Sequence, residues 1–119
     1  MANIFYSEVY RVVGCLPRGT VTSYSAIARA LGRPRAAREV GRAMRFCPSE
    51  IPWQRVVMSD GSIAGGEYAC QRKDMLVAEG VEFLLNGKVD MKKSLLPYKI
   101  LELIAIGAIK EENCSGTQA

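Results

Sequence analysis

The fold is decided by residues 34–45, PRAAREVGRAMR, because this stretch gives one helix two different faces. Apolar residues recur at helical spacing and predict a face that packs on a core: Ala37, Val40 and Met44. Arginines recur with the same period, displaced to roughly the opposite side of the helix: Arg35, Arg38, Arg42 and Arg45. We therefore expect a helix that packs with one side and is cationic on the other.

A shorter helix is expected directly before this one. Ser23 is suited to cap its first turn, and Gly32 is suited to end it. Ile27 and Leu31 lie on one face of this helix, and Arg33-Pro34 leaves only a tight connection to the basic helix. Two short helices joined by a tight turn, the second of them basic, predict a helix-turn-helix motif.

The other helices are predicted from apolar spacing. Helical patterns occur at residues 3–15 and 69–79. Pro97 stands near the start of a further helix in the apolar stretch at residues 94–110. This last helix is apolar around most of its circumference, so it either packs on the core or forms a surface for a dimer or a repair partner.

The β structure is expected to be minor. Short extended pieces are predicted at Val21-Thr22 and at residues 56–58. Residues 81–83 and 89–91 flank Asn86-Gly87, a good turn signal, so a small β-hairpin is expected. The predicted fold class is therefore mainly α with a minor β component.

The positive charge is concentrated on the basic helix. Residues 33–45 carry five arginines and one glutamate, which accounts for the whole formal charge of +4. Basic charge gathered on one short element indicates a polyanion-binding site, and a solvated helix face is the alternative. In the first case the four arginines of the helix are candidates for DNA contact.

Composition argues against several classes of protein. No amino-terminal signal pattern is evident, and the longest apolar run, around residues 100–109, is interrupted by Glu102 and is too short to span a bilayer. We expect a cytoplasmic protein, nucleoid-associated if prokaryotic, with no membrane partner. The four cysteines form no C-x-x-C pair and histidine is absent, so no metal site and no cofactor are expected.

Residues 52–56, Pro-Trp-Gln-Arg-Val, resemble the Pro-Cys-His-Arg-Val active-site signature of the 6-O-alkylguanine-DNA alkyltransferases. Further blocks resemble that family in the same order, and their joint spacing is more specific than any one block: residues 19–28, 34–45, 51–57 and 76–80. The resemblance implies a winged-helix-like helix-turn-helix DNA-binding domain of the alkyltransferase type at residues 1–93. Residues 94–119 would add an apolar helix and a frayed tail, packed on this domain or extending it.

The resemblance also implies how DNA is bound. In that family the second helix of the motif enters the minor groove, and the arginine that matches Arg38 takes the place of an extruded nucleotide. The tyrosine that matches Tyr24 helps to rotate the target phosphate, and a half-buried core position is the alternative. Glu39 stands where a small residue is usual, so its carboxylate either repels DNA or pairs with Arg35 or Arg42. Small residues would let the helix approach the groove closely: Ala36, Ala37 and Gly41.

Alkyl transfer requires a cysteine thiolate that a histidine and a glutamate activate. Trp53 and Gln54 stand in place of the cysteine and the histidine, and they supply neither a nucleophile nor a base near neutral pH. Glu79 matches the glutamate, and a structural role near a helix end is the alternative. The chain is therefore expected not to be an enzyme.

The chain also resembles the alkyltransferase-like proteins, which carry tryptophan at this position and usually histidine after it. These proteins bind alkylated guanine without repairing it. Trp53 matches their pattern, and Gln54 departs from it.

A lesion pocket is predicted around Trp53, whose indole either closes one side of a base pocket or anchors the core. The stretch after Val57 is shorter than in active transferases, so a roomier pocket that tolerates bulky adducts is a hypothesis. Arg55 is more plausible as a structural residue than as a catalytic one. The predicted pocket residues are Trp53, Tyr24, Pro52, Gln54, Arg55, Ala64 and Gly65.

These patterns predict a non-enzymatic protein that recognises 6-O-alkylguanine in double-stranded DNA, extrudes the lesion and directs it to nucleotide excision repair proteins. One alternative is a general helix-turn-helix DNA-binding module without lesion preference. The other is a residual alkyltransferase in which Cys47 accepts the alkyl group, although a thiol without a base should stay largely protonated.

Overall fold

The computed structural model describes residues 4–64 and 66–108. The described chain is mostly helical with a small two-stranded sheet, as the sequence predicted. Its helices and strands are α1 (Ile4–Gly14), β1 (Thr22–Ser23), α2 (Tyr24–Ala30), α3 (Ala37–Arg45), the 3-10 helix η1 (Trp53–Arg55), β2 (Val56–Val57), α4 (Ala69–Ala78), α5 (Met91–Ser94) and α6 (Tyr98–Ala105). No described helix is long and apolar enough to cross a membrane.

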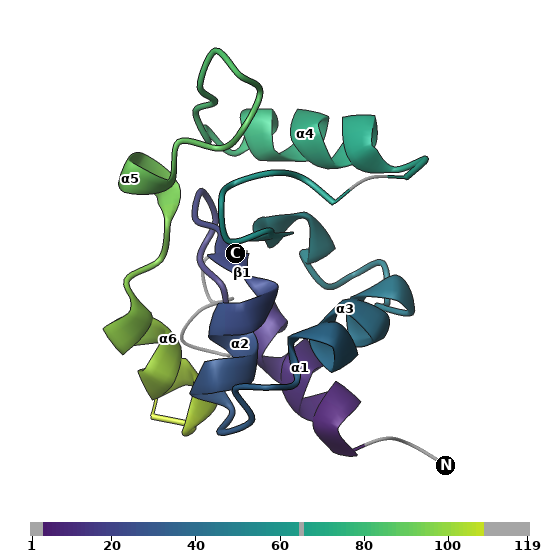
Figure 1. Cartoon of the computed structure of the whole chain (residues 1–119), viewed down its shortest axis with the longest axis vertical. Helices are drawn as coiled ribbons and strands as arrows, with labels where there is room; N and C mark the ends of the chain where they lie inside the picture. The colour runs from purple at the N-terminus through teal and green to yellow at the C-terminus, as the bar shows by residue number, and fades with distance from the viewer. Residues whose placement is uncertain (1–3, 65, 109–119) are drawn as a thin grey trace.

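The larger core lies where α1, α2, α3 and α6 gather at one end of the molecule (Figure 1). The predicted apolar face of α1 is buried there: Phe5, Val9, Val12 and Val13. From α3 the core takes Val40, Ala43 and Met44. Ala37, which the periodicity placed on this stripe, is only half-buried and lines a cavity instead. Ala37 is the first residue of α3, so it lies at the end of the apolar stripe, where the helix faces the cavity and not the core.

The helix-turn-helix forms as predicted, with one shift at its turn. Ser23 caps α2, because its Oγ accepts a hydrogen bond from the Ala26 amide at 3.1 Å. Before α3, the Ala36 amide donates to the Arg33 carbonyl at 2.9 Å, so the chain completes a turn before the helix begins at Ala37. Arg35 therefore lies in this turn and not on the helix.

The sheet joins the helix-turn-helix to the motif at residues 52–56. β1 and β2 run parallel, with Thr22 opposite Val56 and Ser23 opposite Val57. The second strand ends one residue earlier than predicted, because the Met58 amide turns to donate to the Ser62 carbonyl at 2.9 Å. Because the strands are parallel, η1, which precedes β2, lies beside the loop that precedes β1.

A smaller core lies between this sheet and α4: Val21, Val57, Leu76, Val81 and Val89. The hairpin predicted at Asn86-Gly87 narrows to one antiparallel bridge, Phe83 to Val89, closed by a hydrogen bond from the Gly87 amide to the Leu84 carbonyl at 2.9 Å. Gly61 lies against it with φ +91°, and a Cβ at this position would stand 2.7 Å from the Val89 carbonyl oxygen. Only glycine fits this turn.

α6 starts after Pro97 and buries Leu101 and Ile104 against the larger core, which confirms core packing for these two residues. The guanidinium of Arg11 in α1 donates to the carbonyls of Ile104 at 2.9 Å and Ala105 at 2.7 Å. These bonds satisfy backbone acceptors that the end of a helix leaves open. Ile106 remains 74% exposed. The predicted frayed tail lies outside the described residues.

Candidate nucleic-acid interface

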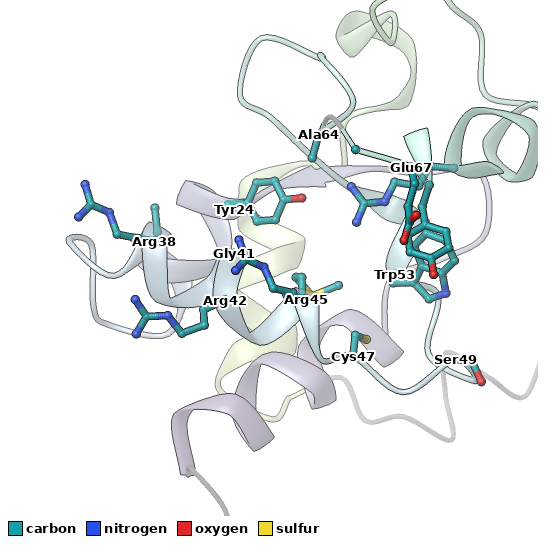
Figure 2. A pocket seen from close by; sticks show the side chains of 15 residues that line it. Tyr24, Arg38, Gly41, Arg42, Arg45, Cys47, Ser49, Trp53, Ala64 and Glu67 are labelled. Atoms are coloured by element: carbon teal, nitrogen blue, oxygen red, sulfur yellow. The ribbon is translucent and has the colours of Figure 1, made fainter. Parts of the chain in front are cut away.

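A cavity of about 1100 Å³ lies between α3, the segment around η1 and the start of α4. Figure 2 shows Trp53 and Glu67 at one end of this cavity in the view drawn, Arg38 and Arg42 at the other, and Tyr24 between them. The lining residues are Tyr24, Ala37, Arg38, Gly41, Arg42, Met44, Arg45, Cys47, Ser49, Trp53, Ala64, Gly66, Glu67, Tyr68 and Arg72. The structure thus joins the basic helix to the tryptophan of the motif in one cavity.

The cationic face of α3 forms the outer part of this site. Arg38, Arg42 and Arg45 are exposed and line the cavity, whereas Arg35 is exposed but does not line it. The Glu39 carboxylate pairs with Arg42 at 3.7 Å, so its partner is not Arg35. Both side chains are about half exposed, and a pair of this kind adds little stability. The salt bridges found among the described residues leave Arg38 and Arg45 free for an anionic ligand.

The small residues of the motif divide into two groups. Ala36 packs against the larger core. Ala37 and Gly41 line the cavity, and a Cβ on Gly41 would meet nothing within 4 Å, so the helix backbone is open to an approaching ligand here. Tyr24, the first residue of α2, both packs against the core and lines the cavity. Its two predicted roles are therefore compatible.

Trp53 is half-buried, packs against the larger core and forms one wall of the cavity. Tyr68 meets it edge-on, with ring centroids 6.4 Å apart and an interplanar angle of 73°. The Arg72 guanidinium carbon lies 5.4 Å from the centre of the Trp53 ring, within cation–π range. The sequence prediction missed Tyr68 and Arg72, because no local pattern links the start of α4 to a motif some fifteen residues earlier.

The other predicted pocket residues differ in whether they reach the cavity. Ala64 lines the cavity, and Gly65 lies outside the described residues. Pro52 precedes η1 as its N-cap and is not among the lining residues. Gln54 and Arg55 do not line the cavity either, because their side chains bond Glu79 instead. The cavity therefore contacts only Trp53 of the five-residue motif.

Glu79 is the centre of a buried network on this second side of η1. Its carboxylate accepts hydrogen bonds from Gln54 Nε2 at 2.6 Å, Arg55 Nε at 2.9 Å and the Gly19 amide at 2.9 Å. Arg55 also donates through Nη1 to the Leu16 carbonyl at 2.6 Å. The network ties η1 to α4 and to the loop before β1. These contacts are the kind that a structural role for Glu79 and Arg55 requires.

The charge of Glu79 follows from these contacts. Burial raises the pKa of its carboxyl group, but hydrogen bonds from Arg55, Gly19 and Gln54, together with the Arg55 charge, outweigh burial. The pKa of Glu79 therefore lies below its ordinary value of 4.5. The ionised carboxylate pairs with the charge of Arg55 in a largely buried position.

Cys47 also lines the cavity, half-buried at its edge. Burial, and then the negative charge of Glu50, raise the pKa of its thiol to about 11. A thiol with this pKa is almost entirely protonated at neutral pH and is a poor nucleophile. Among the described residues no group of three or more Cys, Asp or Glu side chains is arranged to hold a metal ion.

The family model of the 6-O-methylguanine DNA methyltransferase DNA-binding domain matches residues 4–81. The chain belongs to this family. The chain is 38% identical to alkyltransferase-like protein 1 of Schizosaccharomyces pombe, over 79% of this chain and 92% of that protein. It is 37% identical to the DNA base-flipping protein of Escherichia coli K12, over 75% of this chain and 71% of that protein.

A solved structure of the family agrees with the fold. The crystal structure of S. pombe Atl1, in complex with damaged DNA containing O6-carboxymethylguanine, superposes with a TM-score of 0.72 at 34% identity. The match covers 82% of this chain and 98% of that chain. The resemblance to the alkyltransferase family that the motifs indicated is therefore confirmed, together with the helix-turn-helix fold class.

Proposed function

We propose that this protein recognises 6-O-alkylguanine in double-stranded DNA without repairing it. α3 enters the minor groove, Arg38 takes the place of the extruded nucleotide, and the lesion base is held in the cavity against Trp53. The observation that carries this proposal is the single cavity that joins the exposed arginines of α3 to Trp53, the residue in the nucleophile's position. An alkylated guanine pairs poorly, so its extrusion costs less than that of a normal base.

The size and charge of the cavity support this function. Its volume of about 1100 Å³ slightly exceeds the roughly 300–1000 Å³ typical of ligand pockets. A purine with a bulky substituent therefore fits. The exposed Arg42 and Arg45 supply positive charge for the phosphates on either side of an extruded nucleotide.

The absence of alkyl transfer is part of the proposal. The Trp53 indole has no nucleophilic atom, Gln54 donates to Glu79, and the raised pKa of Cys47 keeps its sulfur protonated. The names of the relatives agree with this view, because they describe a base-flipping protein and an alkyltransferase-like protein.

Fluorescence of Trp53 tests the proposal directly, because it is the only tryptophan of the chain. The chain is titrated at one fixed salt concentration with two duplexes that differ only in a single 6-O-methylguanine. We expect tighter binding and a change of indole emission for the damaged duplex. Identical curves would contradict lesion recognition and would favour a general DNA-binding module.

The proposed consequence of binding is recruitment of nucleotide excision repair. A complex that holds the lesion without removing it leaves a bent duplex and a protein marker for other enzymes. Purified excision nucleases should cut a duplex with one bulky 6-O-alkylguanine faster when this protein is present. A rate that is unchanged or slower would contradict recruitment while leaving lesion binding intact.

A further inference from the structure

Arg72 is the cavity residue whose surroundings the proposed function does not explain. It lies in α4, outside the helix-turn-helix, and its guanidinium rests over the Trp53 ring. Two of its nitrogens, Nε and Nη1, are shielded from solvent and have no hydrogen-bond acceptor among the described residues. A buried charged donor without an acceptor is unfavourable. Such groups are rare in native proteins.

The neighbours of Arg72 in the cavity do not relieve this situation. Glu67 is the only carboxylate among the lining residues, and it forms no ion pair with Arg72 in the described structure. Three more arginines line the same cavity: Arg38, Arg42 and Arg45. The cavity is therefore strongly cationic, because four arginines and only one carboxylate line it. Rotation of the long Arg72 side chain would turn its donors toward an acceptor placed beside Trp53.

We propose that Arg72 determines which adducts this cavity prefers. Its donors bind an anionic oxygen at the end of the 6-O substituent, so a carboxylate-bearing adduct binds more tightly than an alkyl group of the same shape. This inference rests on the proposed function, since it requires the lesion base to stand beside Trp53. A charge-assisted hydrogen bond in a shielded site is strong enough to produce at least a ~10-fold preference.

The test compares duplexes that carry 6-O-carboxymethylguanine, 6-O-isobutylguanine or guanine at one position. The two substituents have nearly the same shape, and only the first is charged. Affinities are measured for the unmodified chain, Arg72→Met and the control Lys73→Met. Lys73→Met removes the same charge one residue further along α4. Lys73 is exposed and does not line the cavity.

We expect the unmodified chain and Lys73→Met to prefer the carboxymethyl adduct by ~10-fold or more, and Arg72→Met to lose that preference. Arg72→Lys, which keeps the charge but loses Nε, should retain part of it. Equal loss for both adducts in Arg72→Met would overturn the inference, because Arg72 would then contact a part common to every extruded nucleotide.

The two proposals fail in different ways. If the unmodified chain binds all three duplexes equally, lesion recognition itself fails. If it prefers both damaged duplexes but Arg72→Met leaves the ratio between them unchanged, only the role of Arg72 is refuted. Thermal unfolding of each variant establishes that the compared chains are folded, and Arg72→Lys supplies the comparison if Arg72→Met is not.

Discussion

The two sides of η1 differ in burial and in the partners of their side chains. On one side Trp53 forms a wall of an open cavity beside exposed arginines. On the other, Gln54 and Arg55 bond Glu79, whose side chain is 4% exposed. Adjacent residues, Trp53 and Gln54, therefore face an open cavity and a buried hydrogen-bond network. The glutamate that matches a catalytic position bonds neighbouring segments of the fold, and only the indole of the motif faces the cavity.

Removing Glu79 should have the largest effect. Glu79→Ala leaves the Arg55 cation and the Gln54 and Gly19 donors without their acceptor, and breaking a buried pair in this way typically costs about 3–5 kcal/mol. Denaturant unfolding measures the loss. The control is Glu82→Ala, because Glu82 forms an exposed pair with Lys93 and should cost less than about 1 kcal/mol. A similar loss of unfolding free energy for both variants would contradict the stabilising role assigned to the Glu79 network.

Acid should weaken the network in a defined direction. The pKa of Glu79 is lowered in the folded chain, so its contribution to the free energy of unfolding is complete above about pH 5. That contribution declines as the pH falls below the ordinary value of 4.5 toward the folded-state pKa. Asp60, whose pKa is lowered by hydrogen bonds from Ser62 and Lys88, acts in the same direction.

Because Asp60 also contributes, the effect of Glu79 is isolated by the difference in free energy of unfolding between the unmodified chain and Glu79→Gln. Chemical unfolding at several pH values between 7 and 3 measures it. The stability of Glu79→Gln should depend less steeply on pH than that of the unmodified chain. Parallel curves would mean that Glu79 does not carry the charge assigned to it.

On the ligand side, Arg38 and Arg42 should separate specificity from affinity. Arg38→Ala should remove about 2 kcal/mol of preference for damaged over undamaged duplex, because the vacated stack is no longer filled. Arg42→Ala should weaken binding to both duplexes alike and reduce the slope of log affinity against log salt by about 1. Salt-dependent titrations of both duplexes measure the two quantities. Equal behaviour of the two variants would contradict the separate roles.

The smallest effect is expected from Trp53→Cys. The new thiol would stand at the nucleophile's position. Gln54 donates to Glu79 and cannot accept the proton of this thiol. Alkyl transfer should therefore stay close to zero, measured as an alkyl adduct by mass spectrometry. The double variant Trp53→Cys, Gln54→His should transfer faster, since it restores a base between sulfur and Glu79. Rapid alkyl transfer by Trp53→Cys alone would show that Gln54 in place of a base does not limit the reaction.

Local sequence patterns predicted much of the helical framework. Ser23 caps α2, and Val40 and Met44 turn inward on α3 as their spacing indicated. Capping and amphipathic periodicity act within a few residues, so a single stretch of chain contains the whole cause. The prediction erred at Arg35, because the residues before Ala37 complete a turn, and at Ala37, because the first residue of α3 faces the cavity.

The family resemblance likewise followed from the sequence, because the order and identity of the motif residues carry it. The division of that motif into two sides was decided by the tertiary structure. Glu79 lies 25 positions beyond Gln54, and Tyr68 and Arg72 come from a different helix than the motif they approach. The parallel pairing of β1 with β2 and the packing of α4 against η1 bring these segments together. Such long-range contacts depend on how helices and strands pack, and no local periodicity records them.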